Sequence, residues 1–263
     1  TWNALPIPMI PNREGTDKAH GWYGVRMVSK DEIWALGHYH PGGIGQTRLV
    51  RSLDGGQTWK DVLDGKVGNA ARLHFPTPTD RWVICAAETS FHSTDSGETW
   101  QPVAWGGYMR ILDVVFPPDK DKPQSETGYA VGHLMPWKPD GCVLKTEDGG
   151  VKWQALALPE GTPILNRACF LTPQEGWVGG ENGCILYTAD GGETWGKRSL
   201  PDTKQIVTGI VMFKNGRGFA SVQMRSEGDR MLDEWTLFST TDGGRKWSPE
   251  LGGRKNLTAL YAL

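Results

Sequence analysis

The chain has 263 residues, of which 22% are charged, with a formal net charge of −2 and a sequence pI near 6.3. This near-neutral balance argues against a general nucleic-acid binder, and no run of about 18 apolar residues predicts a membrane span. The 35 glycines and 13 tryptophans, with only short apolar runs, are typical of many short strands joined by tight turns. We therefore expect one all-β domain over residues 1–263.

The predicted strands follow from apolar–polar alternation and from turn signals, and they form repeats of four. An outer strand is expected over residues 1–10 and a last strand over residues 256–263. Between them, five repeats span residues 22–63, 71–104, 110–158, 164–199 and 206–249. The third repeat is lengthened by insertions at 117–127 and 135–141, and the fifth by a polar loop at 225–234.

An octapeptide with the pattern Ser/Thr-x-Asp-x-Gly-x-x-Trp, here called the Asp box, closes the third strand of every repeat. Its five copies cover residues 52–59, 93–100, 146–153, 188–195 and 240–247. Self-similarity at a period of about 40 to 50 residues indicates repeated supersecondary units, of which the four-stranded propeller blade is the all-β form.

Each residue type in the Asp box has a local structural role. The Asp carboxylate accepts backbone N–H bonds, the glycine supplies positive φ, and the Trp covers the turn with an apolar ring. We therefore interpret these residues as structural and not as catalytic acids. They are Asp54, Trp59, Asp95, Trp100, Asp148, Trp153, Asp190, Trp195, Asp242 and Trp247.

The number of blades depends on the two ends of the chain. A propeller can close by building one blade from both termini, which removes open sheet edges. Residues 1–10 and 256–263 then supply two strands of a reduced sixth blade, and six blades is the prediction. Five blades with overhanging ends, or a fragment of a seven-bladed ring, are the alternatives.

A candidate binding site follows from aligning the first strands of the repeats on Phe75, Phe116 and Phe170. The alignment places Arg72, Asp113 and Arg167 at one position, with Arg26 assigned to the same position in the first repeat and Arg110 three residues ahead of Asp113. Arginines favour bidentate contacts with carboxylate or phosphate groups. The hypothesis is a pocket for an anionic ligand or an acidic peptide; the alternative is that these side chains pair with one another and fill the channel.

No metal site or cofactor is expected. His38, His40 and His133 lack a carboxylate or cysteine at ligand spacing. The cysteines lie within predicted strands without CxxC spacing, and they are interpreted as buried free thiols. These cysteines are Cys85, Cys142, Cys169 and Cys184.

The fourth repeat carries the clearest family resemblance. The segment Gly176–Trp195, with echoes at Gly128–Gly132 and Gly218–Ala220, resembles the Asp-box (bacterial neuraminidase repeat) propellers, and within them the photosystem II stability/assembly factor family. The resemblance covers roughly residues 20 to 250. It implies a non-enzymatic propeller on the lumenal or periplasmic side, which binds membrane-protein assembly intermediates through an arginine-rich patch.

Three functions remain open at this point. A protein-binding assembly or scaffold factor in an extracytoplasmic compartment is the prediction. A glycoside hydrolase, sialidase-like, is the second candidate, although Asp113 is the only axial acid that can be assigned and a catalytic pair is needed. A glycan-binding or adhesion module is the third, with Trp105, Tyr108 and Trp137 as its candidate surface. The alternative for these three aromatic residues is packing in the core or within loops.

Overall fold

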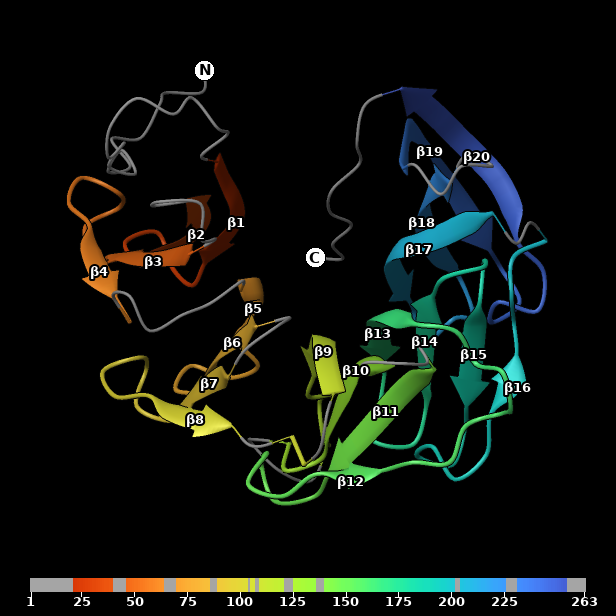
Figure 1. Ribbon diagram of the computed structural model, residues 1–263, viewed down its shortest axis with the longest axis horizontal. Coiled ribbons are helices and arrows are strands. Elements are labelled where there is room, and N and C mark those ends of the chain that lie inside the picture. Colours follow the sequence, from red (N-terminus) through yellow and green to blue (C-terminus); the bar gives the residue numbers. More distant parts are fainter. Residues whose placement is uncertain are drawn as a thin grey trace. The chain divides into compact units, whose positions relative to one another are not determined.

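The computed structural model describes residues 21–39, 46–63, 70–85, 89–103, 105–106, 109–120, 125–135, 140–201, 204–225 and 231–254. These residues form 20 strands and no helix, in five four-stranded sheets (Figure 1). Every sheet is an antiparallel meander in which each strand pairs with the next along the chain. We call the sheets blades 1 to 5 in chain order.

The strands of blade 1 are β1 (Gly21–Met27), β2 (Ile33–Tyr39), β3 (Gln46–Ser52) and β4 (Lys60–Val62), and those of blade 2 are β5 (Ala70–His74), β6 (Arg81–Cys85), β7 (Ser90–Ser93) and β8 (Gln101–Val103). Blade 3 comprises β9 (Met109–Val115), β10 (Gly128–Leu134), β11 (Gly141–Thr146) and β12 (Gln154–Ala155). Blade 4 comprises β13 (Leu165–Phe170), β14 (Gly176–Gly180), β15 (Ile185–Thr188) and β16 (Gly196–Lys197). Blade 5 comprises β17 (Gln205–Met212), β18 (Gly218–Arg225), β19 (Met231–Thr240) and β20 (Ser248–Arg254).

The blades belong to two compact units, residues 1–104 with blades 1 and 2 and residues 105–263 with blades 3, 4 and 5. The all-β class and the five repeats of four strands are confirmed. Five blades, the alternative count, are what the described residues form. The predicted sixth blade draws on residues 1–10 and 256–263, which lie outside the described residues.

The first strand of every blade carries a β-bulge at the same place in the ladder. The bulged residues, which have no partner on the second strand, are Tyr23, Ala71, Leu112, Asn166 and Thr208. A bulge leaves backbone groups out of the ladder and increases the local twist. Each first strand therefore presents a backbone group that a neighbouring element can bind.

Two glycines of the second strands are required by these bulges. A Cβ atom on Gly132 would lie 1.9 Å from the carbonyl oxygen of Arg110, and one on Gly180 would lie 1.9 Å from that of Ile164. No side chain can be accommodated so close to backbone. Gly132 and Gly180 in the sequence thus mark close approach of the first strand to the second.

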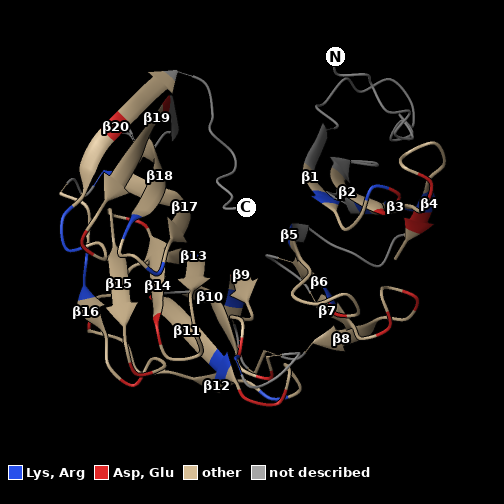
Figure 2. Ribbon diagram, turned by 180° about the vertical axis from the view of Figure 1, so that it is seen from behind, with Lys and Arg blue, Asp and Glu red and all other residues tan. Residues whose placement is uncertain are grey.

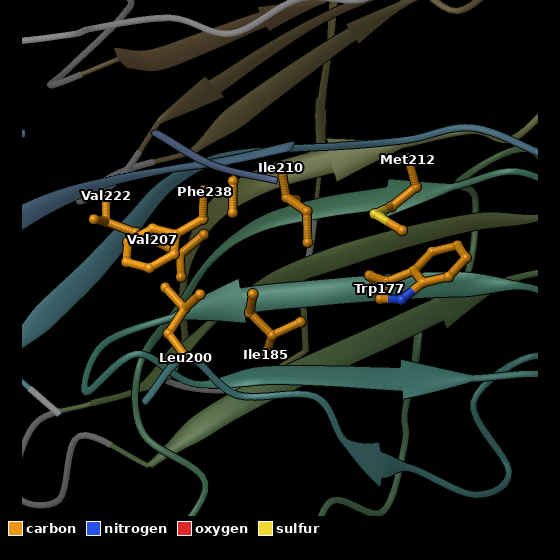
Figure 3. Close-up of a cluster of buried hydrophobic side chains, with 9 residues drawn as sticks. Trp177, Ile185, Leu200, Val207, Ile210, Met212, Val222 and Phe238 are labelled. Atoms are coloured by element: carbon orange, nitrogen blue, oxygen red, sulfur yellow. The ribbon is translucent and has the colours of Figure 1, made fainter. Parts of the chain in front are cut away.

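The core lies between adjacent blades of each unit. In the first unit, Trp34 of blade 1 packs edge-on against Phe75 and Trp100 of blade 2, with ring centroids 5.3 and 6.2 Å apart. Between blades 3 and 4, Tyr129 stacks on Phe170 at 3.8 Å. Blades 4 and 5 enclose the cluster shown in Figure 3, whose labelled members are Trp177, Ile185, Leu200, Val207, Ile210, Met212, Val222 and Phe238.

The four cysteines are free thiols, as expected, and three of them are buried. Burial raises the pKa of Cys142, Cys169 and Cys184 to about 11, so these thiols stay protonated at neutral pH. Trp105 is buried against Trp153 with ring centroids 5.1 Å apart, which agrees with core packing and not with a binding surface. Tyr108 and Trp137 lie outside the described residues.

Candidate functional site

The ladder registers give the positions of the predicted site residues in their blades. The residue directly after the bulge is Arg72 in blade 2, Asp113 in blade 3 and Arg167 in blade 4, opposite Ile84, Val131 and Gly179 respectively. The three side chains therefore occupy one position of the repeat. Arg72 lies in the first unit, whereas Asp113 and Arg167 lie in the second.

Arg26 does not share this position. It pairs with Trp34, two residues farther along β1, and Gly24 follows the bulge in blade 1. The anchor position that Phe75 and Phe170 fill in other blades is taken here by Met27, so an alignment on aromatic residues misplaces the first repeat. The Arg26 side chain is exposed.

Asp113 connects blade 3 to blade 4. Its carboxylate is 5% exposed and accepts hydrogen bonds from the N–H of Val114 at 3.1 Å and from the N–H of Ala168 at 3.2 Å. Ala168 is the residue after Arg167, so the structure brings these two predicted site residues together through the backbone. The carboxylate thus contributes to the contact between two first strands.

Arg167 makes the corresponding connection from blade 4 to blade 5. Its Nε donates to the carbonyl of Thr208 at 2.6 Å, and its Nη1 donates to the carbonyl of Asn166, also at 2.6 Å. Thr208 and Asn166 are the bulged residues of β17 and β13. Arg167 therefore satisfies carbonyl groups that the bulges take out of the ladder.

Arg110 is half-buried on β9 and lies opposite the buried His133. The His133 Nδ1 lies 3.1 Å from the carbonyl oxygen of Leu134. The buried Nε of Arg110 has no hydrogen-bond partner among the described residues. Of the five predicted site residues, Arg110 thus has the clearest unfilled donor.

The Asp boxes form one hydrogen-bonded turn in all five blades. In box 1 the Ser52 hydroxyl donates to Asp54 at 2.8 Å and accepts the N–H of Gly56 at 2.8 Å, while Asp54 accepts the N–H of Thr58 at 2.8 Å. Gly55 and Gly56 have φ of 70° and 91°, which explains the glycine pair. The same bonds recur in the other four boxes, with Thr146, Thr188 and Thr240 in place of serine in boxes 3 to 5.

The box carboxylates are held ionised by these donors. In three boxes hydrogen bonds lower the pKa of Asp54, Asp95 and Asp190 to about 2. The donors are the hydroxyl and the N–H of the threonine at the seventh box position, and the hydroxyl of the first box residue. Boxes 3 and 5 have Lys152 and Lys246 in place of that threonine, and a backbone N–H from the lysine is the largest cause of the lowered pKa. These aspartates are therefore turn-forming anions, unsuited to act as general acids near neutral pH.

The Trp residues at the ends of the boxes are bound less uniformly. The indole N–H of Trp59, Trp100 and Trp153 donates to a glycine carbonyl in its own box at 3.0 to 3.1 Å. Trp247 instead donates to the carbonyl of Arg198 in blade 4 at 2.8 Å. The last box therefore contributes a direct hydrogen bond to the preceding blade.

Grooves beside the Asp boxes were not anticipated from the sequence. One of about 660 Å³ lies between the boxes of blades 1 and 2, and one of about 730 Å³ between those of blades 3 and 4. A third, of about 350 Å³, lies between the Asp box of blade 5 and residues of blade 4 outside its own box. Two sequence positions give each groove a charged or polar side chain. One is the residue immediately before the Asp box of the earlier blade. The other is the sixth residue of the Asp box of the later blade. In the first groove these are Arg51 and Glu98, which form an ion pair at 2.7 Å.

Neither a metal centre nor a spanning segment is seen in the described ranges. They contain no group of three or more His, Cys, Asp or Glu residues placed to hold a metal ion. They also contain no helix long and apolar enough to cross a membrane.

A family model identifies the repeats. The model of the photosynthesis system II assembly factor YCF48 family matches residues 98–209 and 146–255, which together cover more than half of the chain. The chain belongs to the YCF48 family. The resemblance inferred from the fourth repeat is thereby confirmed. No curated protein sequence matches the chain.

Solved structures share the fold at low sequence identity. YCF48 bound to D1 peptide is 18% identical with a TM-score of 0.55, over 83% of this chain and 63% of that one. YCF48 from Cyanidioschyzon merolae is 14% identical with a TM-score of 0.50, over 90% and 86% of the two chains. The GH74 xyloglucanase from Xanthomonas campestris is 19% identical with a TM-score of 0.62, over 84% of this chain but 36% of the enzyme. This chain thus spans less than two thirds of the D1-peptide-bound relative.

Proposed function

We propose that this family member is a non-catalytic binding propeller, an assembly or scaffold factor that holds a segment of a partner protein. The observation that carries the proposal is the YCF48 family match, together with the fold shared with YCF48 bound to D1 peptide. A membrane-protein assembly intermediate is the partner class that this relationship favours. The proposal includes an extracytoplasmic location, which the same relationship supports.

In this proposal each unit binds the partner through its own first strands. In the second unit Arg110 receives a carboxylate group of the partner. In the first unit Arg72 does so, with Arg26 as a more exposed contributor. The side chain of Arg110 is half-buried, so part of it is open to a partner. Asp113 and Arg167 hold adjacent first strands in place, because their hydrogen bonds go to backbone groups of the next blade.

Hydrolysis is the less favoured function. Asp113 is the only acidic residue on the five described first strands, and glycoside hydrolysis usually needs two carboxylates. The likeness to GH74 enzymes is one of fold, and this chain covers about a third of their length.

The test uses a fluorescent D1 peptide as probe and measures anisotropy with purified protein. We expect saturable binding that Arg110→Gln and Arg72→Gln each weaken about tenfold, the loss typical of one charge-assisted hydrogen bond. Arg217→Gln, an exposed arginine in the β17–β18 turn, is the matched control and leaves binding unchanged. Absence of binding, or turnover of xyloglucan or a fluorogenic sialoside, would overturn the proposal.

The apolar face of β1 supports a sixth blade. Val25 and Met27 are 56% and 64% exposed, whereas Phe75 and Phe170, which occupy the Met27 position in blades 2 and 4, are 7% and 5% exposed. In those blades this face packs on the preceding blade. We therefore propose that residues 256–263 and 1–10 contribute the blade that covers β1.

A further inference from the structure

The groove between blade 4 and the Asp box of blade 5 differs in charge from the other two. At the position before the earlier box, the other two grooves have Arg51 and Lys145, and this groove has Tyr187. At the sixth position of the later box, the other two have Glu98 and Glu193, and this groove has Arg245. Arg198 lines the same groove, with its guanidinium carbon 5.0 Å from the centre of the Tyr187 ring. Arg51 pairs with Glu98 in the first groove and Lys145 with Glu147 in the second, whereas this groove has two arginines around a tyrosine.

Among the described residues, the guanidinium groups of Arg198 and Arg245 donate hydrogen bonds only to backbone carbonyls. Arg198 Nη1 donates to the carbonyl of Lys197 and Arg245 Nη1 to that of Asp242, each at 3.1 Å. Neither forms an ion pair with an acidic residue in the described parts of the chain. The buried Nε of Arg198 has no partner there either. The groove therefore contains two positive charges that the described residues do not neutralise by direct pairing.

The acids that line the groove are already engaged. Glu175 accepts the Tyr187 hydroxyl at 3.3 Å, and Asp242 accepts the Thr240 hydroxyl and the Lys246 N–H, both at 2.9 Å. Burial raises the pKa of Tyr187, with a further contribution from Glu175, while the charges of Arg198 and Arg245 act in the opposite direction. Arg198 lies beside the Tyr187 ring, and the charge of Arg245 adds to the hydrogen bond from the Lys246 N–H in lowering the pKa of Asp242.

We propose that this groove binds a small oxyanion, a carboxylate or phosphate group, between the guanidinium groups of Arg198 and Arg245. Guanidinium groups match the geometry of both anions through paired N–H donors. The volume of about 350 Å³ accommodates one compact anionic group and not a long polymer. The site lies in the turns after the third strands, apart from the first-strand residues of the proposed protein-binding surface, and does not depend on that surface.

The experiment is calorimetric titration of the whole chain with inorganic phosphate and, separately, with succinate, at constant ionic strength set by chloride. We expect saturable binding of at least one anion. Phosphate binding alone identifies a phosphoryl group, succinate binding alone identifies a carboxylate, and equal binding identifies selection by charge.

Variants assign the binding to the groove. Arg245→Glu restores the residue type of the other two grooves and should abolish binding, and Arg245→Gln or Arg198→Gln should weaken it about tenfold. Lys246→Thr is the matched control: it removes one positive charge from the same box, outside the groove, and introduces the threonine found in three other boxes. Near-ultraviolet circular dichroism verifies that each variant is folded. No saturable binding of either anion to the wild-type chain, or unchanged binding by folded Arg245→Glu, overturns the proposal.

Discussion

The Nε of Arg167 donates a hydrogen bond of 2.6 Å to the carbonyl of Thr208, which joins the first strands of two neighbouring blades. Thr208 is the bulged residue of β17, so its backbone lies outside the ladder with β18. The bulge and the arginine are therefore complementary: one leaves a carbonyl group unpaired within its sheet, and the other supplies the donor. One blade earlier, Asp113 also joins two first strands, but as an acceptor: its carboxylate takes the N–H of Ala168.

Replacing Arg167 should reduce stability even though the residue was first selected as a binding candidate. Arg167→Met keeps an unbranched apolar stem but removes both donors to the carbonyls of Thr208 and Asn166. We expect the free energy of unfolding to fall by about 1 to 3 kcal/mol, because partly buried carbonyl groups lose their donor. Urea unfolding followed by tryptophan fluorescence measures this loss.

Arg26→Met is the matched control for that experiment. Arg26 is an exposed arginine on a first strand, and substitution there should change stability by less than about 0.5 kcal/mol. Equal destabilisation by the two substitutions would contradict the role assigned to the contact between Arg167 and Thr208.

Spacing in the sequence was sufficient to locate part of this arrangement. Arg72, Asp113 and Arg167 each precede a phenylalanine anchor by three residues, and the ladder registers place them at one position. The same rule counted from Met27 gives Gly24, but a methionine is not recognisable as the anchor, so Arg26 was assigned instead.

The hydrogen-bond partners of these side chains could not be predicted in the same way. Arg167 binds a carbonyl that is available only because β17 bulges at Thr208, and the bulge is a property of pairing with β18, not of residue spacing.

The grooves could not be predicted from the sequence for a related reason. Arg51 and Glu98 come from different repeats, and they meet only because blade 2 packs against blade 1.

Glu32 is expected to be a main electrostatic contact between blades 1 and 2. Its Oε1 accepts the indole N–H of Trp34 at 2.8 Å and lies 3.3 Å from Arg51 and 3.6 Å from Arg81. Arg81 is 1% exposed, with its guanidinium 4.7 Å from the centre of the Phe75 ring. Glu32→Gln leaves this buried cation without its acid, and we expect the free energy of unfolding to fall by about 2 to 3 kcal/mol.

Thermal and urea unfolding of Glu32→Gln provide the measurement. Glu98→Gln is the comparison, because Glu98 binds Arg51 from an exposed position, and there we expect a loss of less than about 1 kcal/mol. A larger loss at Glu98 than at Glu32 would show that the outer ion pair, and not the one at Trp34, stabilises the contact between the blades.

The Asp boxes predict a specific loss of stability in acid. Hydrogen bonds lower the pKa of Asp54, Asp95 and Asp190 from 3.8 to about 2 in the folded chain. A lowered folded-state pKa stabilises the fold above the unfolded value, and this contribution disappears as the pH falls from about 4 to 2. The urea midpoint should therefore drop over that interval.

Asp190→Asn separates the box from other acid effects. The variant should be less stable than wild type at pH 7, and the difference should narrow between pH 4 and pH 2, since protonation removes the same charge from the wild-type box. Glu160→Gln, at an exposed site, serves as the control and should follow the wild-type profile. A constant difference between Asp190→Asn and wild type across this range would argue against ionised Asp190 as the stabilising form.

The proposed sixth blade predicts that Met27 is protected in the whole chain. Met27→Cys introduces a thiol on the apolar face of β1, while the native cysteines lie at buried or partly buried positions. If residues 256–263 help to cover this face, deletion of residues 255–263 should accelerate labelling of Cys at position 27 by iodoacetamide at least about tenfold, since local protection is lost with the covering strand.

Lys30→Cys, in the exposed turn after β1, is the control, and its labelling rate should not change. Rapid labelling at position 27 in the full chain, unchanged by the deletion, would show that these residues do not cover β1 and would leave five blades as the count.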